Sequence, residues 1–290
     1  MLSKKLYFIF GTAAIVMILI VAVVLPDEQS WVSMFIIPFA IMGALSYVFS
    51  PQLDWWWYQK YPPDLPANLG NLLIKYFPFY QNLSAKNKTR FRRRTAMYLE
   101  ARGYKAMTGG EDRDVPLDLK TITAANAIML TFGSKDFILD KFERIFIYLQ
   151  AFPTPDHPYL HASELNEEDT CFLFSAEHVV LAFQQPHKYY NLVLHEFARA
   201  FQLTFPKRNY PEIKEATWEY WEKDSISKFI GIPEDKINPF GVSINFFFQN
   251  PQKFKTLMPE AFEKYQTVFN INPLHPKDPV IDKSVISNVP

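Results

Sequence analysis

Two long uncharged segments near the N-terminus constrain this chain more than any other feature. Residues 6–25 and 31–49 contain no Asp, Glu, Lys or Arg, and each has about the 20 residues that a helix needs to cross the hydrocarbon core of a bilayer. Residues 54–58 follow as Asp-Trp-Trp-Trp-Tyr, and such aromatic side chains gather at membrane–water interfaces. The sequence therefore predicts two transmembrane helices, over about 6–25 and 31–49.

The charges around these segments predict their orientation. Lys4 and Lys5 precede the first segment, the connection carries only Asp27 and Glu28, and a basic run at 90–94 follows the second. Because basic residues stay on the cytoplasmic side, both termini and the following domain are expected in the cytoplasm, at a bacterial inner (cytoplasmic) membrane. A cleaved signal peptide is disfavoured because no small-residue cleavage site follows the first segment. A buried hairpin of a soluble protein is disfavoured by the length and the lack of charge.

Composition argues against nucleic-acid binding and against sites built from cysteines. Lys and Arg together number 30, and Asp and Glu together also number 30. This balance argues against a nucleic acid as a partner, because such binding usually relies on an excess of positive charge. The single cysteine, Cys171, excludes an internal disulfide and a cysteine-rich zinc site.

Past the hydrophobic segments, apolar spacing and turn residues predict a mixture of helices and strands. No alternation of strand, helix and strand is evident, so we expect an α+β fold. Helices are predicted over 84–103, 121–132, 189–205, 216–229, 240–248 and 261–269. Strands are predicted over 142–152, 170–174 and 179–183.

These patterns divide the chain into four expected segments. Prolines mark the second segment as a linker with one short helix, and the last is a loose Pro-rich tail. The segments are a transmembrane hairpin at 1–58, the linker at 59–82, a domain at 83–273 and the tail at 274–290.

One helix carries residues with a chemical pattern. Residues 191–199 read Asn-Leu-Val-Leu-His-Glu-Phe-Ala-Arg. The zincin motif His-Glu-x-x-His places two histidines one helical turn apart to bind zinc, with the Glu as general base. Here His195 and Glu196 fit the motif, but Arg199 stands where the second histidine would be. By itself the His-Glu pair is a weak signal, because a histidine on a helix is usually structural.

The surroundings of this helix resemble the Mlc titration factor A (MtfA-type) family of zinc-dependent peptidases. The resemblance spans about 83–273 and includes residues 179–183, the helix at 191–203 and the segment 240–251, Phe-Gly-Val-Ser-Ile-Asn-Phe-Phe-Phe-Gln-Asn-Pro. It implies a zincin-like domain in which the last segment supplies a third zinc ligand, a Glu. Asn245 stands at the matching position. The chain therefore resembles a membrane-anchored member with a degenerate motif.

The resemblance leaves one of three zinc-ligand positions intact. His195 is the retained ligand and Glu196 the retained general base, which we expect to be silent. Arg199 is a permanent cation that cannot ligate a metal, and Asn245 offers only a neutral amide. We expect Arg199 to occupy the former metal space and to pair with Glu196 and with Asn245. No cofactor is expected, and zinc is expected only if the site is active.

Other side chains are candidates for a rewired metal site with His195, although each has an ordinary structural interpretation. Prolines separate His157 from His161, and His178 and His187 flank a predicted strand. The spacing of Glu215, Glu219 and Glu222 is typical of a solvated helix face.

Three functions remain open on the residues alone. The first is an inactive peptidase homologue, a pseudoenzyme, that binds a protein or peptide in the retained cleft. The second is an active metallopeptidase with altered zinc ligands. The third is a membrane-tethered structural scaffold. Whether the chain is an enzyme stays open, and the first function is favoured because two ligand positions have changed.

Overall fold

The computed structural model describes residues 2–24, 29–107, 114–213 and 222–285, with only the backbone given for 21–24, 29–33 and 35. The chain forms two compact units, the first ending at Pro63 and the second beginning at Asp64.

The first unit consists of helices α1 (Leu2–Val24), α2 (Gln29–Val48) and α3 (Ser50–Lys60). Buried Asp54 of α3 accepts hydrogen bonds from Ser3, at 2.8 Å from the backbone nitrogen and 2.6 Å from the hydroxyl. This carboxylate therefore satisfies a donor that the start of α1 would otherwise leave unpaired.

The first unit supports one membrane span by length and composition. Among the described residues, the helix Leu2–Ile20 is long and apolar enough to cross a membrane. The helices Ile36–Val48 and Ser50–Lys60 meet at a bend of 73°, and they provide a second span only if the two together form one membrane crossing. The predicted pair of spans is thus matched by one clear candidate, and the second span stays a prediction.

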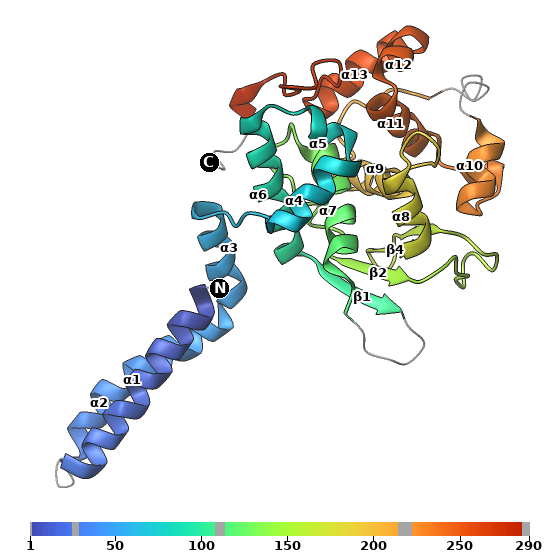
Figure 1. The fold of residues 1–290 in the computed structure, drawn as a ribbon. Coiled ribbons are helices and arrows are strands. Elements are labelled where there is room, and N and C mark those ends of the chain that lie inside the picture. Colours follow the sequence, from blue (N-terminus) through green and yellow to red (C-terminus); the bar gives the residue numbers. More distant parts are fainter. Residues whose placement is uncertain (1, 25–28, 108–113, 214–221, 286–290) are drawn as a thin grey trace. The chain divides into compact units, whose positions relative to one another are not determined.

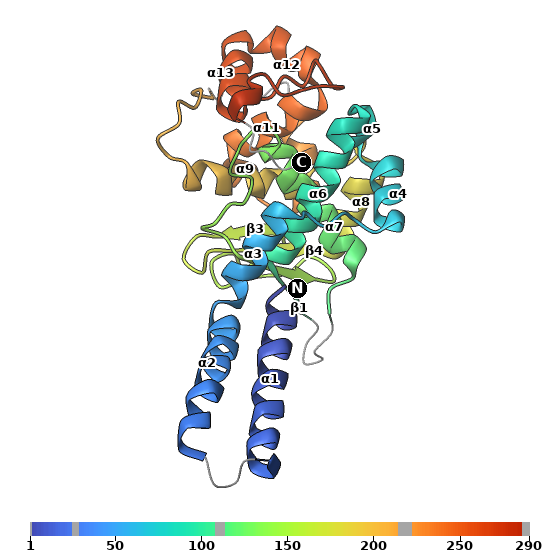
Figure 2. The same cartoon turned by 90° about the vertical axis from the view of Figure 1, so that its left-hand side faces the viewer.

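The second unit contains a four-stranded sheet in the order β1-β2-β4-β3 (Figures 1 and 2). Strands β1 (Gly103–Met107), β2 (Arg144–Tyr148) and β4 (Cys171–Ser175) are parallel. Strand β3 (Ser163–Asn166) runs antiparallel to β4 and forms one edge. With its helices, the unit is mixed α and β as the sequence predicts, and mostly helical.

Helix α9 (Leu192–Thr204) lies between the sheet and α11 (Pro239–Gln249), since it contacts both β3 and α11 (Figure 1). The remaining elements are helices α4 (Ala67–Tyr76), α5 (Pro78–Asn82), α6 (Ala85–Ala101), α7 (Leu117–Thr131), α8 (Ala176–Gln184), α10 (Lys223–Ile230), α12 (Pro251–Leu257) and α13 (Pro259–Phe269), with 3-10 turns η2 (Glu234–Lys236) and η3 (Lys283–Val285).

Helix α7 forms the centre of the core, and an arginine closes its C-terminal end. Ala124, Ala125 and Ile128 are fully buried on α7. Arg94 of α6 is also fully buried and donates hydrogen bonds to the backbone carbonyls of Thr131 and Phe132, at 3.4 and 3.2 Å. A cation at this end is favoured because the last carbonyls of a helix lack partners and carry partial negative charge.

The structure differs from the sequence expectations in three places. The segment 179–183, expected as a strand, lies in α8, because a short apolar run fits a strand and a buried helix equally well. In the expected linker at 59–82, α4 is the one short helix that the sequence predicts, whereas α5 is an additional helix, and apolar side chains such as Leu73 are buried. Strands β1 and β3 lie outside the strands expected from sequence. The expected helix at 216–229 is described only from residue 222, where α10 follows.

Candidate active site

Helix α9 positions the motif residues. It begins at its cap, Asn191, whose side-chain oxygen accepts a hydrogen bond from the backbone of Leu194 at 3.0 Å, and it ends just before Phe205-Pro206. Proline after a helix disfavours continuation, because the residue before it avoids the helical conformation. His195 and Glu196, in the first turns of α9, are 2% and 0% exposed.

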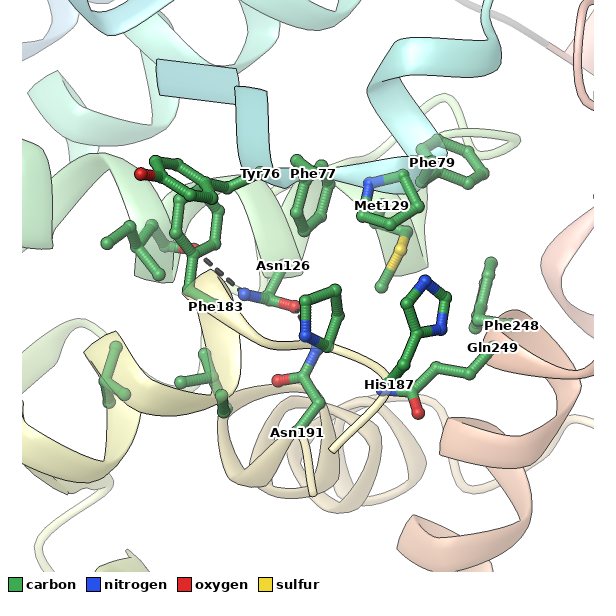
Figure 3. A pocket seen from close by; sticks show the side chains of 16 residues that line it. Tyr76, Phe77, Phe79, Asn126, Met129, Phe183, His187, Asn191, Phe248 and Gln249 are labelled. Atoms are coloured by element: carbon green, nitrogen blue, oxygen red, sulfur yellow. Dashed lines mark hydrogen bonds between the residues drawn. The ribbon is translucent and has the colours of Figure 1, made fainter. Parts of the chain in front are cut away.

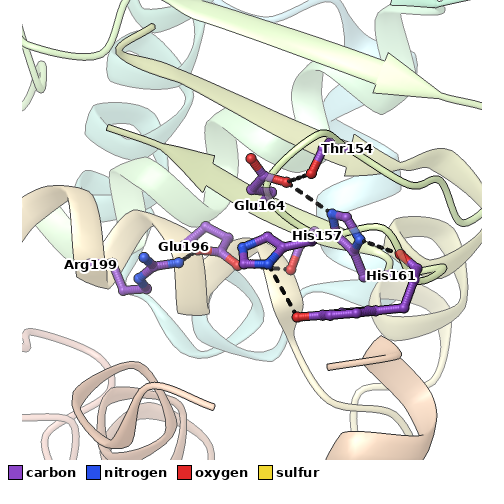
Figure 4. A network of polar contacts seen from close by, with 8 residues as sticks. Thr154, His157, His161, Glu164, Glu196 and Arg199 are labelled. Carbon is purple, nitrogen blue, oxygen red and sulfur yellow. Dashed lines mark hydrogen bonds and ion pairs between the residues drawn. The ribbon is translucent and has the colours of Figure 1, made fainter. Parts of the chain in front are cut away.

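Glu196 is held from two directions. The Ser163 hydroxyl on β3 donates a hydrogen bond to Glu196 Oε1 at 2.9 Å. The Arg199 guanidinium donates to Glu196 Oε2 at 2.8 Å, and the two side chains point toward each other from α9 in Figure 4. The expected Arg199–Glu196 ion pair is therefore present, and it compensates a carboxylate that is fully buried.

Arg199 extends from this pair toward the surface. Its side chain is 26% exposed, and its second terminal nitrogen lies 3.7 Å from Glu167 Oε1, whose side chain is 51% exposed. The outer contact is weak because solvent screens it, whereas the inner contact is shielded. The guanidinium thus has its main partner at the general-base position.

The imidazole of His195 is bound to a tyrosine that precedes α9. The Tyr190 hydroxyl lies 2.6 Å from His195 Nδ1. Burial, opposed by Glu196 and helped by Arg199, lowers the pKa of His195 to about 4. Burial, together with Glu196, raises the pKa of Tyr190 well above its usual range. Both groups are consequently neutral at pH 7.

Asn245 of α11 completes this cluster. Its amide nitrogen donates to the Gly241 carbonyl at 3.1 Å, and its oxygen lies 3.5 Å from Gln249 Nε2. The same side chain hydrogen-bonds to Tyr190. In the part of the chain that the structure describes, Asn245 makes no contact with Arg199, so the expected pairing of these two residues is not found and the amide belongs with Tyr190. Gly241 admits the imidazole, since a β-carbon there would lie only 2.6 Å from His195 Cε1.

The three ligand positions that the resemblance implies do not fit catalytic zinc. One holds an imidazole, one holds a cation engaged with the neighbouring carboxylate, and one holds an amide engaged with Tyr190 and Gly241. Zinc in proteins prefers thiolate, imidazole and carboxylate ligands. Across the residues described, no group of three or more His, Cys, Asp or Glu side chains could hold a metal ion.

The alternative histidines are engaged elsewhere. His161 Nε2 lies 3.0 Å from Glu164 Oε2 and its Nδ1 lies 3.0 Å from a backbone carbonyl, while His157 Nδ1 contacts the Tyr159 hydroxyl at 3.2 Å (Figure 4). Burial raises the pKa of Glu164, but hydrogen bonds from His161 and Thr154 outweigh this effect and hold it below the usual range.

The other described candidates also form no group with His195 that could hold a metal ion. His178 Nδ1 contacts the Ser175 hydroxyl at 2.8 Å, and His187 is exposed. Glu222 is described and lines a groove, whereas Glu215 and Glu219 lie outside the described residues. A rewired site that uses Glu219 therefore stays a hypothesis.

An open groove runs beside the cluster. Tyr190 and Asn245 line it, together with Ile226 and Phe229 of α10 and Val242 of α11. The sequence pattern did not indicate the roles of the Tyr190 hydroxyl and of Ser163 in this cluster. Gly241, one helical turn before Asn245, was the available signal for close packing of α11 on α9.

Comparison with known proteins finds one family match. A sequence model of the glucose-regulated metallo-peptidase family M90 matches residues 54–225. The match covers more than half of the 290 residues and contains His195, Glu196 and Arg199, whereas Asn245 lies beyond it. A search of curated proteins finds no match to this chain.

Proposed function

This chain belongs to the glucose-regulated metallo-peptidase family M90, and we propose that it is a catalytically inactive member that binds a protein or peptide in its retained groove. The family is zinc-dependent in general, and the domain is metallopeptidase-like.

The observation that carries the proposal is the buried ion pair between Arg199 and Glu196. A general base must accept a proton from water, and Glu196 instead accepts hydrogen bonds from Arg199 and Ser163 at 2.8 and 2.9 Å. Both carboxylate oxygens of Glu196 are therefore already engaged by hydrogen-bond donors. The Arg199 cation repels a divalent metal from the position where the family's second histidine would bind it.

The groove supports the binding half of the proposal. It remains open next to Tyr190 and Asn245 and combines apolar walls with several polar groups, which is typical of ligand sites. Loss of catalysis removes no part of this surface, so peptide recognition can persist without hydrolysis.

Membrane attachment is part of the proposal. Large apolar side chains of α1, such as Phe8 at 73% and Ile9 at 60%, are exposed, and a continuous apolar surface of this kind needs a lipid or protein environment. Together with the charge pattern, this supports an anchor in a bacterial inner membrane with the domain in the cytoplasm.

The proposal is tested with the full chain in lipid nanodiscs, supplied with zinc and a mixture of fluorogenic peptides. We expect peptide binding without hydrolysis, and we expect Ser225→Trp, a bulky change in the exposed groove wall, to remove the binding. Hydrolysis that disappears in Glu196→Gln would overturn the proposal in favour of an active metallopeptidase with altered ligands. Absence of any binding would favour a structural scaffold.

The restored variant Arg199→His with Asn245→Glu serves as the matched comparison. It returns an imidazole and a carboxylate to the two changed positions, and these are ligands that zinc accepts. Zinc uptake by this variant, with none by the wild type, is the result expected if those two residues alone remove the metal.

A further inference from the structure

A second, more enclosed pocket lies beside the groove. Its cavity volume is about 90 Å³, and aromatic and aliphatic side chains form most of its wall. Figure 3 shows Phe77, Phe79, Phe183, Phe248 and Met129 around it. A wall of this kind accepts an aromatic ring, because rings pack favourably in offset and edge-to-face arrangements.

The base of this pocket is tied to the motif helix. Asn191, which caps α9, donates a hydrogen bond to Asn126 Oδ1 of α7 at 2.7 Å, and Asn126 donates to the Ile122 carbonyl at 2.9 Å (Figure 3). Asn126 is 2% exposed and hydrogen-bonded. The pocket is consequently preorganised by packed helices and needs little rearrangement to take a ligand.

The pocket and the groove share part of their lining. Pro186, His187 and Gln249 border both, and Gln249 lies 3.5 Å from Asn245 in the cluster of the altered site. A peptide that follows the groove past Asn245 therefore reaches the mouth of the pocket with one of its side chains.

The groove also has a charge preference among its described residues. Lys188, Lys228 and Lys253 line it, against the single carboxylate Glu222. Lys228 pairs with Asp224 at 2.6 Å, while Lys188 and Lys253 are exposed and lie near aromatic rings. Exposed lysines attract acidic groups at low ionic strength.

We propose that this pocket receives an aromatic side chain of an acidic peptide segment that lies in the groove. The proposal rests on the proposed function, because it specifies which peptides the groove selects. It assigns the selection of the aromatic side chain to the pocket and the selection of acidic neighbours to Lys188 and Lys253.

The test uses fluorescein-labelled hexapeptide mixtures and the full chain in nanodiscs, with binding followed by anisotropy. One central position is fixed as Phe, Trp or Ala and the others are equimolar mixtures. We expect the Phe and Trp mixtures to bind about tenfold more tightly than the Ala mixture, as burial of a large apolar side chain predicts. Fixing Glu beside Phe should tighten binding further, and Lys188→Gln with Lys253→Gln should abolish that gain.

Two comparisons assign the aromatic preference to the pocket. Ala182→Phe, on the buried pocket wall, should fill it and equalise the Phe and Ala mixtures, while Thr267→Phe, in a separate pocket on α13, should leave the preference intact. Indole, an aromatic ring without a peptide backbone, should displace the Phe mixture from the wild type and leave the Ala mixture bound. Displacement by indole does not require any variant to fold.

The outcomes separate the two proposals. Equal binding of all mixtures, lost in Ser225→Trp, would overturn the pocket's role while leaving peptide binding in the groove. An aromatic preference that persists in folded Ala182→Phe and resists indole would also overturn it. No binding of any mixture would overturn both.

Discussion

Replacing Arg199 by methionine should destabilise the protein by leaving Glu196 buried without its cation. Breaking a fully buried ion pair costs about 3–5 kcal/mol. Glu196 is 0% exposed but the Arg199 side chain is 26% exposed, so a smaller loss of about 2–3 kcal/mol is expected here. The free energy of unfolding is measured on the full chain in detergent, by urea titration with pulse proteolysis of the larger unit.

A double-mutant cycle isolates this contact. Glu196→Gln in the Arg199→Met background removes the uncompensated charge and keeps a group that can accept the hydrogen bond from Ser163. The double variant should therefore recover part of the lost stability, which corresponds to a coupling energy of about 2 kcal/mol between the two residues. Glu167→Gln is the control, because its contact with Arg199 is long and half-exposed and should contribute under about 0.5 kcal/mol. A loss below about 0.5 kcal/mol in Arg199→Met, with no coupling, would refute the buried pair.

Three further predictions concern the cluster around His195. Gly241→Ala should destabilise the protein by about 1–3 kcal/mol, because its β-carbon would overlap the His195 ring. Gly103→Ala is the control: no atom lies within 4 Å of its added carbon, so its stability should change little. Both are measured by thermal unfolding. Burial lowers the pKa of His195 to about 4, so on acidification this imidazole takes up its proton in the unfolded chain before it does so in the folded one. The free energy of unfolding should therefore fall as the pH drops from about 6.5, by about 2 kcal/mol at pH 5. The same pH dependence of unfolding in His195→Gln would contradict this. Tyr190→Phe should lose about 1 kcal/mol with its hydrogen bond, and no change in unfolding free energy would count against that bond.

The sequence predicted helices with strong local signals. The helix expected at 84–103 is α6, because Ser84 caps it, accepting a hydrogen bond from Asn87 at 3.4 Å, and the apolar spacing continues to its end. The short runs were harder to interpret. Residues 179–183 give no periodicity that separates strand from helix, and β3 is only four residues long with a polar composition.

The site was predictable where its contacts are local. Arg199 and Glu196 are three residues apart on one helix, so their pairing follows from helical geometry. Ser163 reaches Glu196 from another element, and the Tyr190–Asn245 contact depends on how α11 crosses α9. Such contacts depend on tertiary packing, which one sequence does not specify by spacing alone.

The central claim, that this M90 member has lost its catalytic metal, is tested most directly by the zinc content of the purified full chain. Elemental analysis after dialysis against excess zinc and then buffer should find far less than one zinc per chain, and His195→Ala should not alter that value. Stoichiometric zinc that disappears on His195→Ala would contradict the account.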